Sequence, residues 1–217
     1  MWTYKGVKVH WLGHDSFVLQ GSRTVVLDPF RAKGSYAADV LLVSHEHFDH
    51  LSDEDVRRFA KQSTLMVAPE QCEGPLKAFG QEKRIVKPWE SLDAIGVKIE
   101  AVPAYNLNKF REPGKVFHPK EDRKVGYLVT MDGVRFYHAG DSDFIPEMKS
   151  LDVDVAFLPV SGTYVMTAEE AAEAAGSISA KALVPMHIGK IVGTMADAER
   201  FRALVGKNKK VEILEEE

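Results

Sequence analysis

The 217-residue sequence contains a single cysteine, Cys72, and this scarcity excludes several classes of protein. An intramolecular disulfide cannot form, and a zinc finger or ribbon built on paired thiolates cannot be assembled. No stretch approaches the ~18 uninterrupted apolar residues of a membrane-spanning helix, and residues 1–10 lack the apolar run of a secretory signal. These absences predict a protein of a reducing compartment without a membrane partner, and we expect it to be cytoplasmic.

An excess of positive charge is also missing. Lys and Arg number 28 against 32 Asp and Glu, for a formal net charge of −4, so the chain has no overall electrostatic signature for nucleic acid. With 45% hydrophobic and 28% charged residues, the composition is that of a globular protein and not of a disordered one. The length and the lack of a linker favour one domain over residues 1–217.

Apolar runs of strand length alternate with turns early in the chain, and helical patterns follow later. Strands are expected at 7–12, 16–19, 24–27, 40–44, 65–68, 84–87, 97–102, 125–130, 134–138, 155–159, 182–185 and 211–214. Helices are expected at 53–62, 70–79, 144–150, 167–176 and 195–205, and Thr167 with Glu170 forms a capping box at the start of the fourth. This order predicts a mixed, layered α/β fold.

The chain contains a short internal similarity. Asp39-Val-Leu-Leu-Val-Ser resembles Asp154-Val-Ala-Phe-Leu-Pro-Val-Ser, and each segment follows a predicted hairpin whose second strand leads to an acid, Asp28 or Asp141. Two similar halves would place both sets of strand ends at one edge of the fold. Chance is the competing explanation for so short a match.

Histidines gather directly after the predicted strand at 40–44. The segment Ser44-His45-Glu46-His47-Phe48-Asp49-His50 holds three of the eight histidines. Imidazole and carboxylate groups are good ligands for zinc and similar divalent ions, and a loop leaving a strand allows neighbouring side chains to converge. Aspartate at position 49 and the preceding strand pattern exclude the helical H-E-x-x-H motif of zinc proteases. The segment therefore predicts a metal site.

His45-x-His47-x-Asp49-His50 resembles the signature of the metallo-β-lactamase superfamily, and the resemblance extends along most of the chain. Asp28 is similar to the early aspartate that supports the metal loop, and Asp141 to the aspartate that bridges two metals. His187, after a short predicted strand, is similar to the late metal histidine. The opening Gly13-His14 is similar to the start of the ascorbate-6-phosphate lactonase and N-acyl phosphatidylethanolamine phospholipase D branches.

The resemblance implies a four-layer αββα sandwich with a binuclear site at the shared edge of two sheets. In that family one metal takes His45, His47 and a third histidine, the other takes Asp49, His50 and His187, and Asp141 lies between them. The cofactors implied are two divalent metal ions, foremost Zn²⁺, with Mn²⁺ or Fe²⁺ accepted by the same ligand types.

The third histidine is where the sequence departs from those branches. Asn106, in Pro103-Ala104-Tyr105-Asn106, stands where they have histidine, and asparagine is a poor zinc ligand. His118 follows in the same loop, and we predict that it completes the first metal site. The alternative is a substrate-facing or surface histidine, which would leave that metal weakly held.

Two neighbouring cations would lower the pKa of a bound water, so that a bridging hydroxide could attack an ester, lactone, amide or phosphodiester. Asp49 is expected to orient this water. His14, Tyr105 and His118 are candidates for protonating the leaving group.

The loop at 106–124 carries six basic and three acidic residues and has little periodicity. As a lid over the metals, it would clamp a phosphate or carboxylate group of the substrate. A solvated basic surface loop is the other interpretation.

Together these features predict a metal-dependent hydrolase acting on a small, anionic molecule. A non-catalytic metal-binding or ligand-sensing module is the alternative that Asn106 favours. A nuclease of the same superfamily is a further alternative, against which the net charge of −4 argues. The sequence leaves the substrate and the oligomeric state open.

Overall fold

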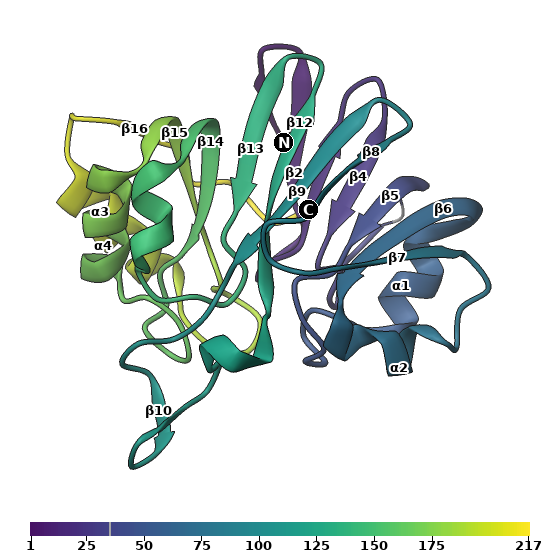
Figure 1. Ribbon diagram of the computed structural model, residues 1–217. Helices are drawn as coiled ribbons and strands as arrows, with labels where there is room; N and C mark the ends of the chain where they lie inside the picture. The colour runs from purple at the N-terminus through teal and green to yellow at the C-terminus, as the bar shows by residue number, and fades with distance from the viewer. Residues whose placement is uncertain (35) are drawn as a thin grey trace.

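Two seven-stranded sheets pack face to face in the computed structural model, which describes residues 1–34 and 36–217 (Figure 1). The first sheet follows chain order: β1 (Trp2–Tyr4), β2 (Val7–Trp11), β3 (Phe17–Gln20), β4 (Thr24–Leu27), β5 (Ala38–Leu42), β6 (Ala60–Pro69) and β7 (Glu82–Val86). The second has the order β16 (Lys210–Val211), β15 (Ser179–Met186), β14 (Asp152–Pro159), β13 (Val134–His138), β12 (Val125–Met131), β9 (Val97–Pro103) and β8 (Ser91–Ala94). A hairpin of β10 (Phe110–Glu112) and β11 (Lys115–Val116) projects from one end (Figure 1).

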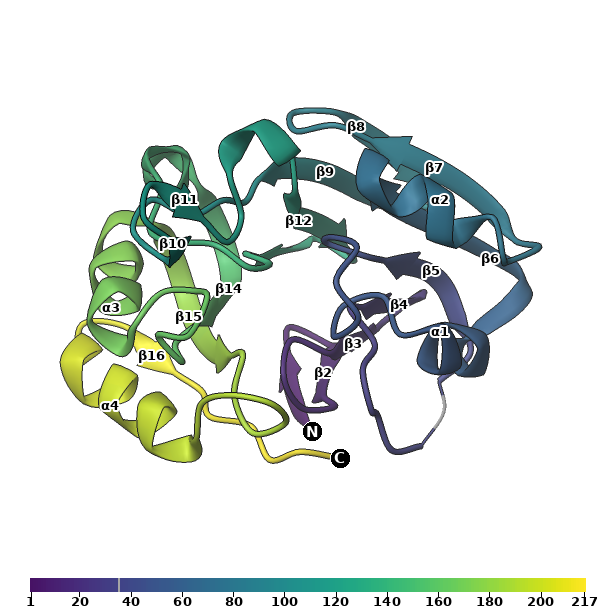
Figure 2. The same ribbon diagram turned by 90° about the horizontal axis from the view of Figure 1, so that it is seen from below.

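Helices cover the outer faces of both sheets. Figure 2 shows α1 (Asp53–Phe59) and α2 (Glu73–Leu76) beside the first sheet, and α3 (Ala168–Ser177) and α4 (Met195–Val205) beside the second. Short 3₁₀ turns occupy Glu70–Cys72, Lys120–Asp122 and Pro146–Ser150. The expected αββα sandwich is confirmed. Within the described ranges, no helix has both the length and the apolar character needed to cross a membrane.

Strand periodicity explains how the first sheet is buried on both faces. Along β4, Val25 and Leu27 face the core between the sheets, and Val26 faces the core under α1 and α2. Such alternation follows from the two-residue repeat of a strand. The rings of Phe17 on β3 and Phe157 on β14 lie 4.4 Å apart across the two sheets. Each fully buried side chain of this size contributes about 1.5–3 kcal/mol by leaving water.

The two halves of the chain share a strand order that brings their functional ends together. β3 pairs with β4 antiparallel and β4 with β5 parallel; likewise β12 pairs with β13 antiparallel and β13 with β14 parallel. The internal similarity in the sequence is thus matched by topology. As a result, the segment at 44–50 and Asp141, which follow strands of different sheets, meet at one edge.

A hydrogen bond between the sheets fixes the start of the histidine-rich loop. The hydroxyl of Tyr127 on β12 donates to the carbonyl of Val43 at 2.8 Å, in the residue before Ser44. The Tyr127 side chain is fully buried, so this bond replaces water that the hydroxyl has lost. It ties the second sheet to the exact point where the loop leaves the first.

Helix α4 has the predicted bounds, and α3 begins with the predicted Thr167–Glu170 capping box. Three other predicted helices are wrong in extent. The helix expected at 53–62 ends at Phe59, because Ala60 pairs with Ala38 at the start of β6. The helix expected at 70–79 is a 3₁₀ turn followed by a four-residue α2, which contains a glycine and a proline. The helix expected at 144–150 is the 3₁₀ turn at Pro146–Ser150.

Four short strands were not predicted: β1, β8, β10 and β11. Each has four residues or fewer, and most of their side chains are at least partly exposed. An apolar run that short carries little periodic signal. Their pairing depends on neighbouring strands and not on their own composition.

Gly126 on β12 allows the close approach of β13. A Cβ at this position would lie 2.5 Å from the carbonyl oxygen of His138 and 2.8 Å from that of Ala139. We expect Gly126→Ala to lower the free energy of unfolding by about 1–3 kcal/mol, because the strands must separate. Gly176→Ala in α3, where a Cβ meets no atom within 4 Å, should raise it by about 0.5–1 kcal/mol. Urea unfolding measures both variants, and equal effects would contradict this packing.

Candidate metal centre

Asp28, at the end of β4, organises the loop at 44–50. Its Oδ1 accepts a hydrogen bond from the Ser44 amide at 2.7 Å, and its Oδ2 accepts one from the Ser44 hydroxyl at 2.6 Å. The same Oδ2 lies 2.8 Å from Nδ1 of His50. Because the carboxylate accepts the Nδ1 proton, Nε2 of His50 is left to face the opposite way.

His45, His47 and His118 form the first group of convergent side chains. Nε2 of His45 lies 3.0 Å from Nδ1 of His47, and Nε2 of His118 lies 3.4 Å from that same atom. The three nitrogens lie within 4.8 Å of one another, as ligands of one ion would. His118 comes from the loop before β12, so the structure brings it to the group as the sequence predicted it could.

The second group lies around His50 and His187. One ligand atom from each of His14, Asp49, His50 and His187 lies within 4.8 Å of the others. The orientation of His187 is fixed on its other side, where Nδ1 lies 2.8 Å from the Ser161 hydroxyl. His50 and His187 are therefore held, by Asp28 and Ser161, with Nε2 turned toward the same point.

Asp141 lies between the two groups and directs one carboxylate oxygen toward each. Its Oδ2 is 3.6 Å from Nε2 of His118 and 3.9 Å from Nε2 of His45. Its Oδ1 is 3.3 Å from Nε2 of His50 and 3.4 Å from Nε2 of His187. This is the geometry expected of a carboxylate shared by two cations.

The turn before Asp141 requires glycine. Gly140 has φ of +60°, and a Cβ there would lie 2.9 Å from the Val125 carbonyl oxygen and 3.1 Å from Cβ of Ser44. Since glycine alone adopts this conformation without a steric penalty, it allows the Asp141 turn to touch the loop at 44–50. Three other residues at the site, His14, Asp28 and His187, also have positive φ although they carry side chains. Such strain, about 1–3 kcal/mol per residue, is concentrated at functional sites.

Burial and charge set the protonation of the ligand-type side chains. Burial lowers the pKa of His45 well below its usual value and that of His118 to about 4, which keeps both rings neutral. Burial alone would raise the pKa of Asp49, but the hydrogen bond with His14 and the charge of His50 lower it to about 2. Burial would likewise lower the pKa of His50, but Asp141 and Asp28 hold it well above its usual value. A cation binding at His50 must therefore displace a proton.

Buried polar atoms without a hydrogen-bond partner gather at this edge. In the described part of the chain they include His14 Nδ1, both carboxylate oxygens of Asp15, His50 Nε2, His118 Nδ1, Asp141 Oδ1 and His187 Nε2. Unpartnered buried polar atoms are rare and costly, each by about 1–3 kcal/mol. Their nitrogen and carboxylate composition fits divalent metal ions, which would satisfy several of them at once.

Asn106 holds His118 in place and is not one of the convergent side chains. Its Oδ1 accepts a hydrogen bond from the His118 amide at 2.9 Å, and its Nδ2 donates to the Tyr164 carbonyl at 2.8 Å. Asn106 is thus bonded to the backbone of the histidine that we predict as a ligand of the first metal ion.

Tyr105 is not one of the side chains that converge on either side of Asp141. Its hydroxyl donates to Oε2 of Glu147 at 2.9 Å, and the residue lines a cavity with Pro88, Trp89 and Arg123. Of the side chains predicted to transfer protons, His14 does belong to the second group, with Nε2 3.2 Å from Oδ2 of Asp49.

A cavity of about 330 Å³ opens over the two groups. Its lining consists of His47, Phe48, Asp49, Phe117, His118, Asp141, Tyr164 and Ile191. The rings of Phe117 and Tyr164 lie 4.6 Å apart, edge to face, on one side of it. Nothing in the sequence singles out Phe117 or Ile191, since an apolar residue in a loop carries no periodic signal.

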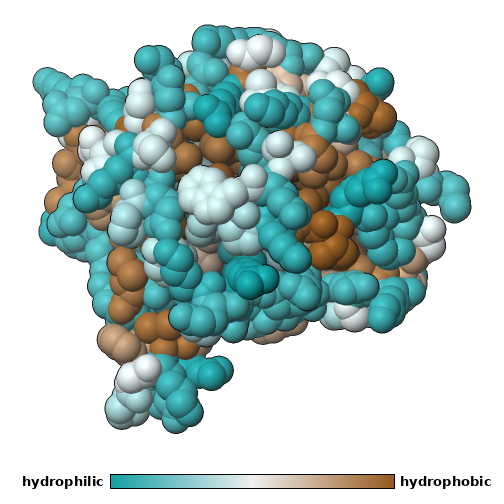
Figure 3. All heavy atoms as spheres, viewed as in Figure 1, coloured by the Kyte–Doolittle hydropathy of each residue, from teal (hydrophilic) through white to brown (hydrophobic). Residues whose placement is uncertain are grey.

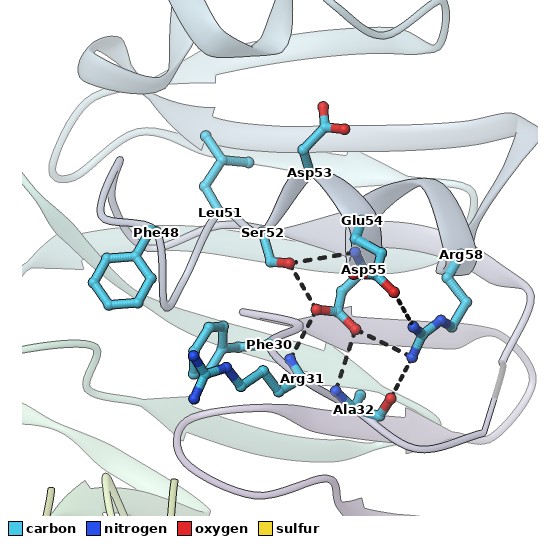
Figure 4. Close-up of a pocket in the computed structure, with 10 residues that line it drawn as sticks. All are labelled: Phe30, Arg31, Ala32, Phe48, Leu51, Ser52, Asp53, Glu54, Asp55 and Arg58. Atoms are coloured by element: carbon cyan, nitrogen blue, oxygen red, sulfur yellow. Dashed lines mark hydrogen bonds and ion pairs between the residues drawn. The ribbon is translucent and has the colours of Figure 1, made fainter. Parts of the chain in front are cut away.

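A second hollow, of about 480 Å³, shares only Phe48 with the first and is structural (Figure 4). There Asp55 of α1 accepts hydrogen bonds from the amides of Arg31 and Ala32 at 2.8 and 3.2 Å and from the Ser52 hydroxyl at 2.6 Å. These bonds anchor the segment after β4 to the helix that follows the metal loop. Both oxygens of the Asp55 carboxylate take part in these hydrogen bonds.

The lysines of the basic loop at 106–124 form ion pairs with carboxylates. Its lysines pair as follows: Lys109 with Asp143 and Glu170, Lys115 with Glu112, Lys120 with Glu147, and Lys124 with Glu46. Lys124 is buried, so its pair with Glu46 fixes the end of the loop to the segment at 44–50.

On the face shown in Figure 3 most of the surface is hydrophilic, and apolar residues gather in small patches.

The chain is similar to proteins described as metal-dependent hydrolases. A family model described as a beta-lactamase superfamily domain matches residues 8–187. A protein of Methanoculleus marisnigri, named a metal-dependent hydrolase, is 33% identical over 95% of this chain and 92% of its own length. One of Pyrococcus furiosus, also named a metal-dependent hydrolase, is 31% identical over 96% of both chains.

Solved structures have the same fold. The crystal structure of a Parabacteroides distasonis protein is 35% identical, with a TM-score of 0.82 over 95% of this chain and 92% of that one. A metallo hydrolase of Ignicoccus hospitalis has a TM-score of 0.78 over 96% of this chain and 95% of that one, at 23% identity. The sandwich is therefore common to archaeal and bacterial proteins.

Asp28→Asn tests whether Asp28 holds the loop at 44–50 in a geometry that binds metal. The amide cannot accept the Nδ1 proton of His50 and the two Ser44 hydrogen bonds as the carboxylate does, so we expect metal affinity to fall about 10–100-fold. Chelator competition measures the affinity. Asp39→Asn, at the other end of the neighbouring strand, is the control and should leave it unchanged; equal losses would show a general effect on folding.

Asn106→Ala tests the placement of His118. The variant keeps every convergent imidazole but frees the His118 backbone, so affinity for one ion should fall about 10-fold. Asn108→Ala, in the same loop, removes side-chain hydrogen bonds with Glu170 and Lys109 but none with His118, and is the control. Metal affinity that does not change in Asn106→Ala would contradict this role.

Proposed function

This chain belongs to the beta-lactamase superfamily and is a metal-dependent hydrolase, and from this premise we propose that it binds two divalent ions and hydrolyses an ester, lactone or phosphodiester bond of a small molecule. The observation that carries the proposal is the position of Asp141. One oxygen faces His45 and His118, and the other faces His50 and His187. A single ion would use only one side of this arrangement.

The ligands we propose fall on the two sides of Asp141. His45, His47 and His118 hold the first ion, Asp49, His50 and His187 hold the second, and Asp141 bridges them. Zn²⁺ is the ion we propose, because imidazole and carboxylate at these spacings suit it, and Mn²⁺ or Fe²⁺ would be accepted by the same groups. When bound, the pair of cations supplies a hydroxide nucleophile at neutral pH and a Lewis acid for the substrate oxygen.

Asp49 and His14 act on the attacking water in this proposal. The low pKa of Asp49 keeps it a carboxylate, which orients a water proton more readily than it removes one. His14 fixes that carboxylate through Nε2, at 3.2 Å from Oδ2. The role of Tyr105 as a proton donor stays a prediction. Its side chain lines another cavity.

The cavity supports a small substrate with an apolar portion. Its volume of about 330 Å³ suits a small molecule, and Phe117, Tyr164 and Ile191 offer apolar surface beside Asp141. An anionic group on the substrate remains the prediction from the loop at 106–124. No lysine or arginine is among the described lining residues of the cavity, so within it only the proposed metal ions would offer such a group positive charge.

The non-catalytic alternative loses its main support. It was favoured by Asn106 in place of a metal histidine, but Asn106 instead positions His118 beside His45 and His47. A nuclease gains no support from the cavity, because no lysine or arginine that could hold a phosphate backbone is among its described lining residues.

Asp49→Ala tests the hydrolase proposal. Loss of the carboxylate that orients the water should lower kcat/KM about 10²–10⁴-fold on any substrate turned over by the metal-loaded protein. The assay uses panels of neutral and anionic esters, lactones and phosphodiesters. Asp53→Ala, an exposed carboxylate in α1, is the control and should keep full activity. Turnover by the parent protein that does not exceed that of Asp49→Ala on any panel would contradict the proposal.

A further inference from the structure

Asp15 has a buried carboxylate that makes no hydrogen bond with the described residues. It lies between β2 and β3, directly after His14, and its side chain has no exposure to solvent. Neither carboxylate oxygen has a hydrogen-bond partner among the described residues. A buried carboxylate without hydrogen bonds costs several kcal/mol, so Asp15 would oppose folding unless another group compensates for the lost water.

The nearest groups to this carboxylate are nitrogens of the metal centre. Oδ2 of Asp15 lies 3.7 Å from Nε2 of His14, 3.7 Å from Nε2 of His50 and 3.9 Å from Nε2 of His187. Together with His50, Asp141 and His187, it forms a group whose ligand atoms all lie within 4.8 Å of one another. Ligand atoms about 2.1 Å from one ion lie roughly 3–4 Å apart, which matches these separations.

The backbone of Asp15 is held in register with Asp141. Its carbonyl accepts a hydrogen bond from Nε2 of His138 at 2.9 Å, and Nδ1 of His138 accepts one from the Gly140 amide at 3.3 Å. His138 thus links the segment carrying Asp15 to the turn carrying Asp141. The backbone from which the Asp15 side chain extends is therefore tied to the second sheet.

We propose that Asp15 is a ligand of the second metal ion, alongside Asp49, His50, Asp141 and His187. This inference rests on the proposed pair of ions. It makes the two positions chemically unequal, since the first has three imidazoles and one oxygen of Asp141, whereas the second has three carboxylates and two imidazoles. Nitrogen-rich, four-ligand sites favour Zn²⁺, and oxygen-rich sites with more ligands favour ions such as Mn²⁺.

Metal binding by Asp15→Asn tests the inference without any assay of turnover. The metal-stripped full chain is given one equivalent of Zn²⁺ and then titrated with Mn²⁺, with free Mn²⁺ followed by electron paramagnetic resonance. We expect the parent protein to bind one Mn²⁺ per chain and Asp15→Asn to bind it at least 10-fold more weakly. Asp55→Asn, which alters a buried carboxylate in α1, is the control and should bind Mn²⁺ as the parent does.

Thermal unfolding separates a ligand from a structural residue. Without metal, Asp15→Asn should change the Tm little, because the carboxylate makes no hydrogen bond that the amide would lose, and its gain in Tm on adding Mn²⁺ should be smaller. Unchanged Mn²⁺ affinity, or an equal fall in Tm with and without metal, would overturn the role of Asp15. A parent protein that binds only one ion in total would instead overturn the proposed pair of ions.

Discussion

The buried Asp141 carboxylate is the group on which the rest of the site depends. Side chains from both sheets converge on it, and most of them are shielded from water. Gathering so many charged and polar groups is unfavourable unless their positions are enforced. Here glycine at 140 permits the approach, Asp28 and Ser161 orient two of the imidazoles, and Tyr127 ties the sheets together at the start of the loop.

Topology explains why distant parts of the sequence meet at this carboxylate. Each sheet contains a hairpin followed by a parallel strand, so the strand ends that precede the 44–50 loop and Asp141 point to one edge. His187 reaches the same edge because it follows β15, which pairs in parallel with β14. His118 arrives differently, from the loop before β12, and depends on Asn106 for its position.

Much of the fold and of the candidate site could be predicted from the sequence, because the patterns that indicate them are local or periodic. The mixed, layered α/β fold follows from the strand and helix patterns, the αββα sandwich from the resemblance that the histidine motif carries, and the start of α3 from its capping box. Asp15 could not be found in this way, since nothing in its neighbourhood tells a buried aspartate from an exposed one. Tyr105 shows the converse: its place beside Asn106 suggested a role at the metals, but its hydroxyl turns to Glu147. Both cases depend on side-chain direction, which tertiary packing decides.

We propose that Asp141 lies between two metal positions at one edge of the sandwich. Anomalous X-ray diffraction from crystals of the metal-loaded protein would locate the ions. We expect two anomalous peaks, one beside His45, His47 and His118 and one beside His50 and His187, with an Asp141 oxygen next to each. A single peak, or a second peak that Asp141 does not touch, would contradict it.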